Sequence, residues 1–132
     1  MKRTMLYGII LIAAFVIGVF AWMQYSELSF LPKETGKTWV QIDSVSCLGN
    51  SWEQDWLSSN NRTYEEYPRN SENEIITAYY NKQGITIFSV KTKFTQPKFM
   101  CTACSCGNGY TFYLLILDSD VGKMLSYGYK VA

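Results

Sequence analysis

Apolar and polar residues divide the chain into a long hydrophobic start and a patterned remainder. Nineteen residues without a charge, Met5 to Met23, follow Lys2 and Arg3. As a helix, this stretch would measure roughly 28 Å, which is close to the thickness of the hydrocarbon core of a bilayer. We therefore predict that residues 1–25 form an N-terminal transmembrane signal-anchor, which contacts the lipid bilayer through residues 5–23.

The charges around this stretch predict its orientation. Positively charged residues remain on the cytoplasmic side, so we expect a single-pass protein of the cell membrane with its N-terminus cytoplasmic and its C-terminal domain outside. Residues 26–37 are typical of a linker, and residues 38–132 form one extracytoplasmic domain. A cleaved signal peptide over residues 1–21 is the alternative, because Val19-Phe20-Ala21 resembles a cleavage site.

The rest of the chain alternates in ways that predict strands. Apolar and polar residues alternate over residues 38–47 and 85–94, and a nearly continuous apolar run covers residues 110–117. The apolar run is typical of a central strand. The last four residues, YKVA, are expected to form a short edge strand.

Capping signals predict the helices between these strands. Asn50 precedes Glu53 by three residues and Ser71 precedes Glu74 by three residues, and both pairs resemble capping boxes at helix starts. Two helices therefore follow the first strand. A final helix is expected after Asp118 or Ser119, either of which is a suitable N-cap residue.

The order β, α, α, β, β, α, β predicts the class α+β. A right-handed crossover makes the first two strands parallel, and the third, antiparallel to both, fits between them. The result is a small ferredoxin-like α/β sandwich with a cysteine-rich loop between the second and third strands. Because parallel strands end at the same edge of a sheet, Cys47 and the loop CTACSC are expected to meet.

Four cysteines, Cys47, Cys101, Cys104 and Cys106, carry the main candidate chemistry. Outside the cytoplasm, they are expected to form two disulfides. A bond between Cys104 and Cys106 would close a strained ring, so Cys47 is expected to pair with Cys104 or Cys106, and Cys101 with the other.

Two other interpretations of the cysteines stay open. Four thiolates suit copper or zinc, with Met100 as a possible extra soft ligand. The C-x-x-C spacing of Cys101 and Cys104 also suits a thiol–disulfide redox protein.

Charge and motifs exclude some functions and leave weaker candidates. The net charge is +1 and no basic stripe exists, so we expect no nucleic-acid partner. No histidine and no catalytic motif is present, which disfavours an enzyme without deciding the question. Asn61 begins a glycosylation sequon, and a candidate partner surface is formed by Trp39, Trp52 and Trp56.

Three segments, CLGNSWEQDWL, CTACSCGNGYTFYLL and DSDVGKMLSYGYK, together resemble an uncharacterised family of small membrane-anchored proteins of ammonia-oxidising archaea. The family pattern reads CLGNxWExDWL and CxACSC, and the resemblance spans most of the domain after the linker. Ser51 stands where the family often has proline, which suits the same helix start. The resemblance implies no catalytic residue, and it favours copper by context, because such cells depend on copper enzymes outside their membrane.

These observations predict a membrane-anchored extracytoplasmic interaction or accessory module that is stapled by disulfides and performs no catalysis. Its expected partner is another membrane or cell-surface protein. A copper- or zinc-binding protein with a four-cysteine site is the second hypothesis, and a thiol–disulfide redox protein is the third.

Overall fold

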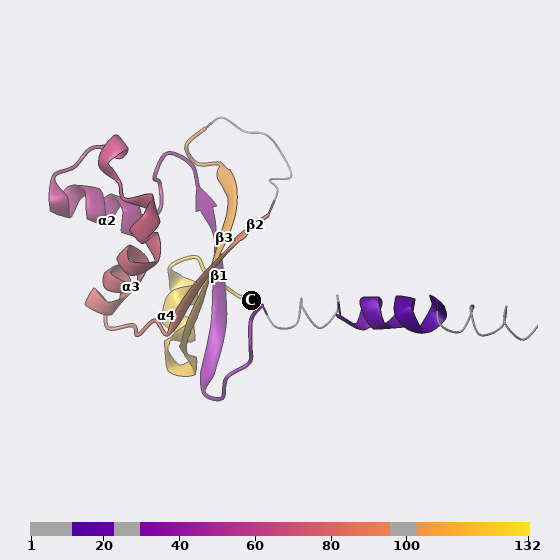
Figure 1. The fold of residues 1–132 in the computed structure, drawn as a ribbon. Coiled ribbons are helices and arrows are strands. Elements are labelled where there is room, and N and C mark those ends of the chain that lie inside the picture. The colour runs from indigo at the N-terminus through magenta and orange to yellow at the C-terminus, as the bar shows by residue number, and fades with distance from the viewer. Residues whose placement is uncertain (1–11, 23–29, 96–102) are drawn as a thin grey trace, which may run out of the picture. The chain divides into compact units, whose positions relative to one another are not determined.

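A computed structural model describes residues 12–22, 30–95 and 103–132 of the chain (Figure 1). The chain divides into two compact units, Met1–Lys33 and Glu34–Ala132. In the first unit, residues 12–22 form a helix whose side chains are all exposed. The second unit contains every other helix and strand described below.

The predicted transmembrane anchor requires correction. Across the described ranges, no helix is long and apolar enough to cross a membrane. The helical part that the structure describes here, residues 12–22, would measure about 16 Å, roughly half the thickness of the hydrocarbon core. The prediction rested on a count of uncharged residues, and such a count does not establish one continuous helix. The transmembrane helix is therefore wrong, and so is the single-pass localisation with an outside domain that depended on it.

The second unit is an α+β structure with a four-stranded antiparallel sheet in the order β2-β3-β1-β4 (Figure 1). The strands are β1 (Lys37–Val45), β2 (Ser89–Phe94), β3 (Gly107–Leu117) and β4 (Lys130–Val131). β3 lies between β1 and β2 and pairs antiparallel with both, so β1 and β2 run in the same direction. The fold prediction, an anchor followed by a ferredoxin-like sandwich, is wrong as a whole because of the anchor, although the three long strands have the expected order.

Three helices accompany this sheet: α2 (Ser51–Asn60), α3 (Glu72–Lys82) and α4 (Val121–Ser126). Two short 3-10 turns, Tyr64–Glu66 and Arg69–Ser71, connect α2 to α3, and a third, Asp118–Asp120, precedes α4. All three helices contribute side chains to one core cluster with the sheet. They therefore share the same face of the sheet.

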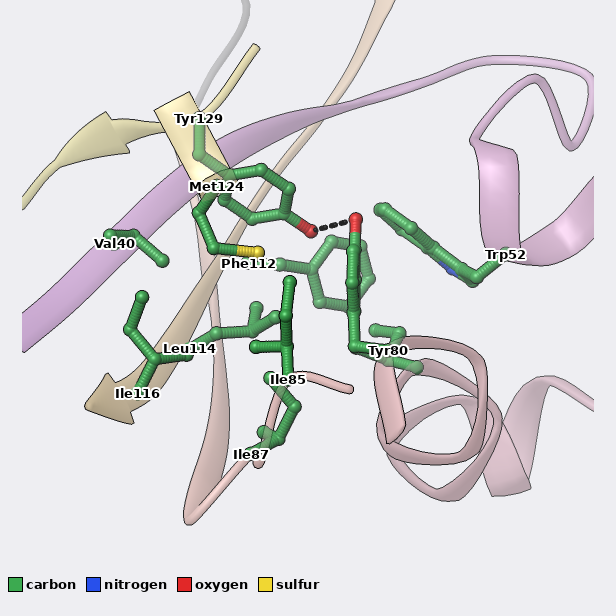
Figure 2. Close-up of a cluster of buried hydrophobic side chains, with 11 residues drawn as sticks. Val40, Trp52, Tyr80, Ile85, Ile87, Phe112, Leu114, Ile116, Met124 and Tyr129 are labelled. Carbon is green, nitrogen blue, oxygen red and sulfur yellow. Dashed lines mark hydrogen bonds between the residues drawn. The ribbon is translucent and has the colours of Figure 1, made fainter. Parts of the chain in front are cut away.

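The core follows from the alternation of β3. Phe112, Leu114 and Ile116 are buried and point to the helices, where they meet Trp52 of α2 and Met124 of α4 (Figure 2). Burial of such side chains contributes about 1.5–3 kcal/mol each. The core also includes two hydroxyl groups, because the Tyr80 and Tyr129 side chains form a hydrogen bond of 2.8 Å with each other (Figure 2).

Candidate functional site

A disulfide joins the end of β1 to the start of β3. Cys47 and Cys104 are bonded across 57 residues of chain, with Cα atoms 5.1 Å apart, and both residues are exposed. This bond confirms one of the two pairings that were expected for Cys47. Cys106 is disulfide-bonded as well, whereas Cys101 and Met100 lie outside the described residues.

The disulfide also bears on the metal hypothesis. Metal ions bind cysteine as the thiolate, and a disulfide sulfur is not a thiolate. Among the residues that the structure describes, no group of three or more histidine, cysteine, aspartate or glutamate side chains could hold a metal ion. A four-cysteine site for copper or zinc would therefore need the reduced protein and stays a prediction.

The Cys47–Cys104 disulfide is attached to a tight turn between β1 and α2. Cys47 and Leu48 both have left-handed backbone conformations, with φ of 58° and 52°, which costs non-glycine residues of the order of 1–3 kcal/mol each. A Cβ atom on Gly49 would lie 2.8 Å from the Val45 side chain, so a larger residue there would have to displace Val45. The Ser46 N–H donates to the Cys106 carbonyl oxygen at 2.8 Å. Bonds to the β3 side of the sheet thus hold this strained turn in place.

A buried polar network connects the turn to the first helix. The backbone N–H and the side-chain amide of Asn50 both donate to Glu53 Oε2 at 2.8 Å. The same amide donates to Ser44 Oγ at 3.1 Å, and the Asn108 amide donates to Ser44 Oγ at 2.9 Å. The capping box predicted for Asn50 and Glu53 is therefore confirmed. The box predicted for Ser71 and Glu74 is absent, because a 3-10 turn already ends at Ser71.

A pocket of about 350 Å³ opens beside this network, on the helix-covered face of the sheet. Ser44, Thr92, Asn108, Tyr110 and Phe112 line it from the three long strands. Its other lining residues are Glu53 of α2, Glu72 and Asn73 of α3, and Arg69 and Asn70 of the preceding 3-10 turn. The volume lies within the range of small-molecule sites, about 300–1,000 Å³.

Two carboxyl groups, those of Glu53 and Glu72, line the pocket, and their charges act on the buried Tyr67 nearby. Glu53 is only 3% exposed, and this burial, together with the negative charge of Glu72, raises its pKa to about 7 in spite of the hydrogen bonds from Asn50. Tyr67 is 5% exposed, and its hydroxyl has no hydrogen-bond partner among the described residues. Burial, followed by the charges of Glu72 and Glu53, raises the pKa of Tyr67. Glu53 and Glu72 therefore form an acidic pair in the pocket, and Tyr67 is outside its lining.

Two other polar side chains near these carboxyl groups, those of Trp52 and Arg69, already form hydrogen bonds. The Trp52 indole N–H donates to Glu72 Oε1 at 3.3 Å. The exposed Arg69 guanidinium donates to the Tyr64 hydroxyl at 3.0 Å and lies against its ring. Among the ion pairs between described residues, none includes Glu53, Glu72 or Arg69.

The tryptophans of the candidate partner surface do not share one exposed patch. Trp52 is in the core and Trp39 is 7% exposed, with the Lys91 ammonium 5.3 Å from its ring. Trp56 is half-buried and packs edge-to-face on Tyr67 at 5.5 Å. Asn61 is exposed at the C-terminal end of α2, and whether it is glycosylated stays a prediction.

Sequence reasoning missed most of the pocket. Glu53 was predicted only as part of a helix cap, and the structure shows that this cap is buried. One signal for this was available, since Glu53 directly follows a core tryptophan and bonds to a buried N-cap residue. Glu72, Tyr67 and Asn108 gave no local signal, because only the packing of distant segments brings them together.

No protein-family model, no curated protein and no solved structure matches this chain. The resemblance to the archaeal family stays a prediction. The function must therefore be argued from the geometry of the site.

Proposed function

We propose that the Glu34–Ala132 unit is a non-catalytic, disulfide-stapled binding module that receives a polar ligand group in the pocket beside the staple. The observation that carries this proposal is the pocket itself. It combines a volume suited to a small molecule or a side chain with buried polar groups that converge on it.

The support for a preformed site comes from its surroundings. The floor belongs to three hydrogen-bonded strands, and the wall next to Glu53 is fixed by the Asn50 network and by the Cys47–Cys104 bond. A preformed pocket loses little conformational entropy when a ligand binds. A second, larger groove of about 470 Å³ lies along α3 beside residues 87–90, but Glu74 is its only charged lining residue and it has no buried polar group.

Binding is favoured over catalysis because the pocket has carboxyl, amide and hydroxyl groups but no activated nucleophile. The chain contains no histidine, and the disulfide removes Cys47 and Cys104 as thiolates. The exposed disulfide favours an oxidising compartment. The partner in this proposal is a small polar molecule or a protein that presents the same chemical group.

A fragment screen by ligand-observed NMR with the full-length oxidised protein tests the proposal. Thr92 and Lys93 are neighbours on β2, so their side chains point to opposite faces of the sheet. Thr92→Trp should fill the pocket and abolish fragment binding, whereas Lys93→Trp should leave it unchanged. Fragments that bind both variants equally, or a diverse set without any binder at millimolar concentration, would contradict the proposal.

A further inference from the structure

We propose that the outer edge of β2 binds an extended segment of a partner protein as an additional antiparallel strand, and that this segment has acidic side chains at alternate positions. The inference does not depend on the ligand proposed for the pocket. It depends on the backbone groups along the edge of β2, on the groove beside α3 and on two lysine residues of β2.

The outer edge of β2 offers backbone hydrogen bonds to another strand. In the described part of the chain, β2 is the last strand of the sheet and pairs with β3 alone. The Thr95 N–H donates to the Gly109 carbonyl oxygen at 2.6 Å, and such bonds recur at every second residue of an antiparallel pair. The backbone groups of Val90, Thr92 and Phe94 therefore point away from β3. An exposed edge of this kind is a template for an extended segment of another chain.

A groove beside this edge can receive side chains of an added strand. It has a volume of about 470 Å³ and lies between α3 and residues 87–90. Val90 pairs with Leu114, which belongs to the core beneath the helices, so every second side chain of an added strand would also point to the helix side. The groove lining includes Val90 and Ala78, and Glu74 is the one charged residue among the described lining residues. The side chains of the added strand that enter the groove should therefore be apolar.

The other face of β2 selects the charge of the added strand. Lys91 and Lys93 alternate with Val90 and Thr92, so they lie on the face of the sheet that the helices do not cover. Opposite charges directly across a strand pair attract each other, and like charges repel. The residues of the added strand that lie across from the two lysines should therefore be acidic.

The same lysines disfavour a second copy of this chain as the occupant. A twofold axis that pairs two β2 strands antiparallel places residues of the same face across from each other. Lys91 of one copy would then lie across from Lys91 or Lys93 of the other, which is a repulsive arrangement. Lysine residues on edge strands prevent self-association in this way. The charge pattern therefore favours a different protein with an acidic strand.

The test uses NMR titration of the full-length oxidised protein at low salt with a blocked peptide, Thr-Val-Glu-Val-Glu-Val-Thr, and with its analogue in which lysine replaces glutamate. We expect the glutamate peptide to bind at least about tenfold more tightly, because two attractive pairs replace two repulsive ones. The amide signals of Val90, Thr92 and Phe94 should shift most. Shifts confined to Glu53 and Asn108 would place the peptide in the pocket instead and overturn the inference.

Backbone N-methylation of the peptide tests the strand pairing itself. The valine residues pair directly with Val90, Thr92 and Phe94, and in an antiparallel pair their N–H groups point to β2. N-methylation of the valines should therefore abolish binding. N-methylation of the glutamates, whose N–H groups point away from β2, should leave the affinity unchanged. Any other pattern would overturn the antiparallel pairing.

Two matched protein variants test the role of charge. Lys93→Gln removes one of the two attractive pairs and should reduce a tenfold preference for the glutamate peptide to about threefold. Lys130→Gln is the control with the same change in net charge, because Lys130 is exposed on β4 at the opposite edge of the sheet. It should retain the full preference. Equal effects of the two variants, or no binding of the glutamate peptide at millimolar concentration, would contradict the inference.

Discussion

Glu53→Gln should make the protein more stable above neutral pH and leave its stability unchanged in acid. Burial raises the pKa of Glu53 from its usual 4.5 to about 7 in the folded protein. Between these two values, the folded state binds more protons than the unfolded state, so the free energy of unfolding of the native protein falls as the pH rises. Above about pH 7, the full cost of ionising this buried side chain is present.

The size of the effect follows from the two pKa values. A difference of one pKa unit corresponds to about 1.4 kcal/mol, so the change from 4.5 to about 7 costs about 3 kcal/mol. This is a large share of the roughly 5–15 kcal/mol that stabilises a typical domain. Glutamine has no charge to bury, and its amide oxygen can still accept both hydrogen bonds from Asn50. The advantage of the variant should therefore grow from near zero below pH 4.5 to about 3 kcal/mol above pH 7.

The assay is urea unfolding of the native protein and the variant, followed by tryptophan fluorescence across this pH range. Glu66→Gln is a control of opposite sign, because hydrogen bonds from Thr63 and Arg62 lower the pKa of the exposed Glu66. Stability from Glu66 is present at neutral pH and is lost as the pH falls, so this variant should lose stability at neutral pH only. A constant difference between Glu53→Gln and the native protein at all pH values would refute the burial argument.

Three further predictions concern the staple and the buried hydroxyl groups. Replacing both Cys47 and Cys104 with serine should lower the free energy of unfolding by about 4 kcal/mol, because their bond closes a loop of 57 residues; an unchanged urea midpoint would contradict this. Tyr67→Phe should raise the free energy of unfolding by about 1–2 kcal/mol, because the substitution removes an unpartnered buried hydroxyl. A decrease would mean that this hydroxyl has a partner. Tyr80→Phe should have the opposite effect, a loss of about 1–2 kcal/mol seen as a lower melting temperature, because it leaves the Tyr129 hydroxyl unpaired.

The sequence predicted those parts of the fold that depend on local spacing. Alternating residues predicted β1, a continuous apolar run predicted β3, and the three-residue spacing from Asn50 to Glu53 identified the start of α2. The predicted strand order then placed Cys47 near the cysteine loop. Such features depend on residues within a few positions of each other, so a single segment contains the necessary information.

Local patterns gave wrong predictions where the same pattern is compatible with two different structures. Uncharged residues at the N-terminus indicated a transmembrane helix, yet no helix of the described residues is long and apolar enough to cross a membrane. Residues 85–94 alternate like one strand, but β2 begins only at Ser89, because Ile85 and Ile87 enter the core before the strand while Phe88 is exposed. Hydrophobicity alone does not distinguish a strand from an irregular segment that packs on the core.

The sequence by itself determined the strand pattern, the first helix cap and the convergence of the cysteines. Only the tertiary structure decided that Cys104 pairs with Cys47, that Glu53 is buried and that Tyr67, Glu72 and Asn108 surround the same network. The physical reason is that burial and charge interactions depend on which distant segments pack together. The acidic pocket exists because two helices, a 3-10 turn and three strands meet at one end of the sheet.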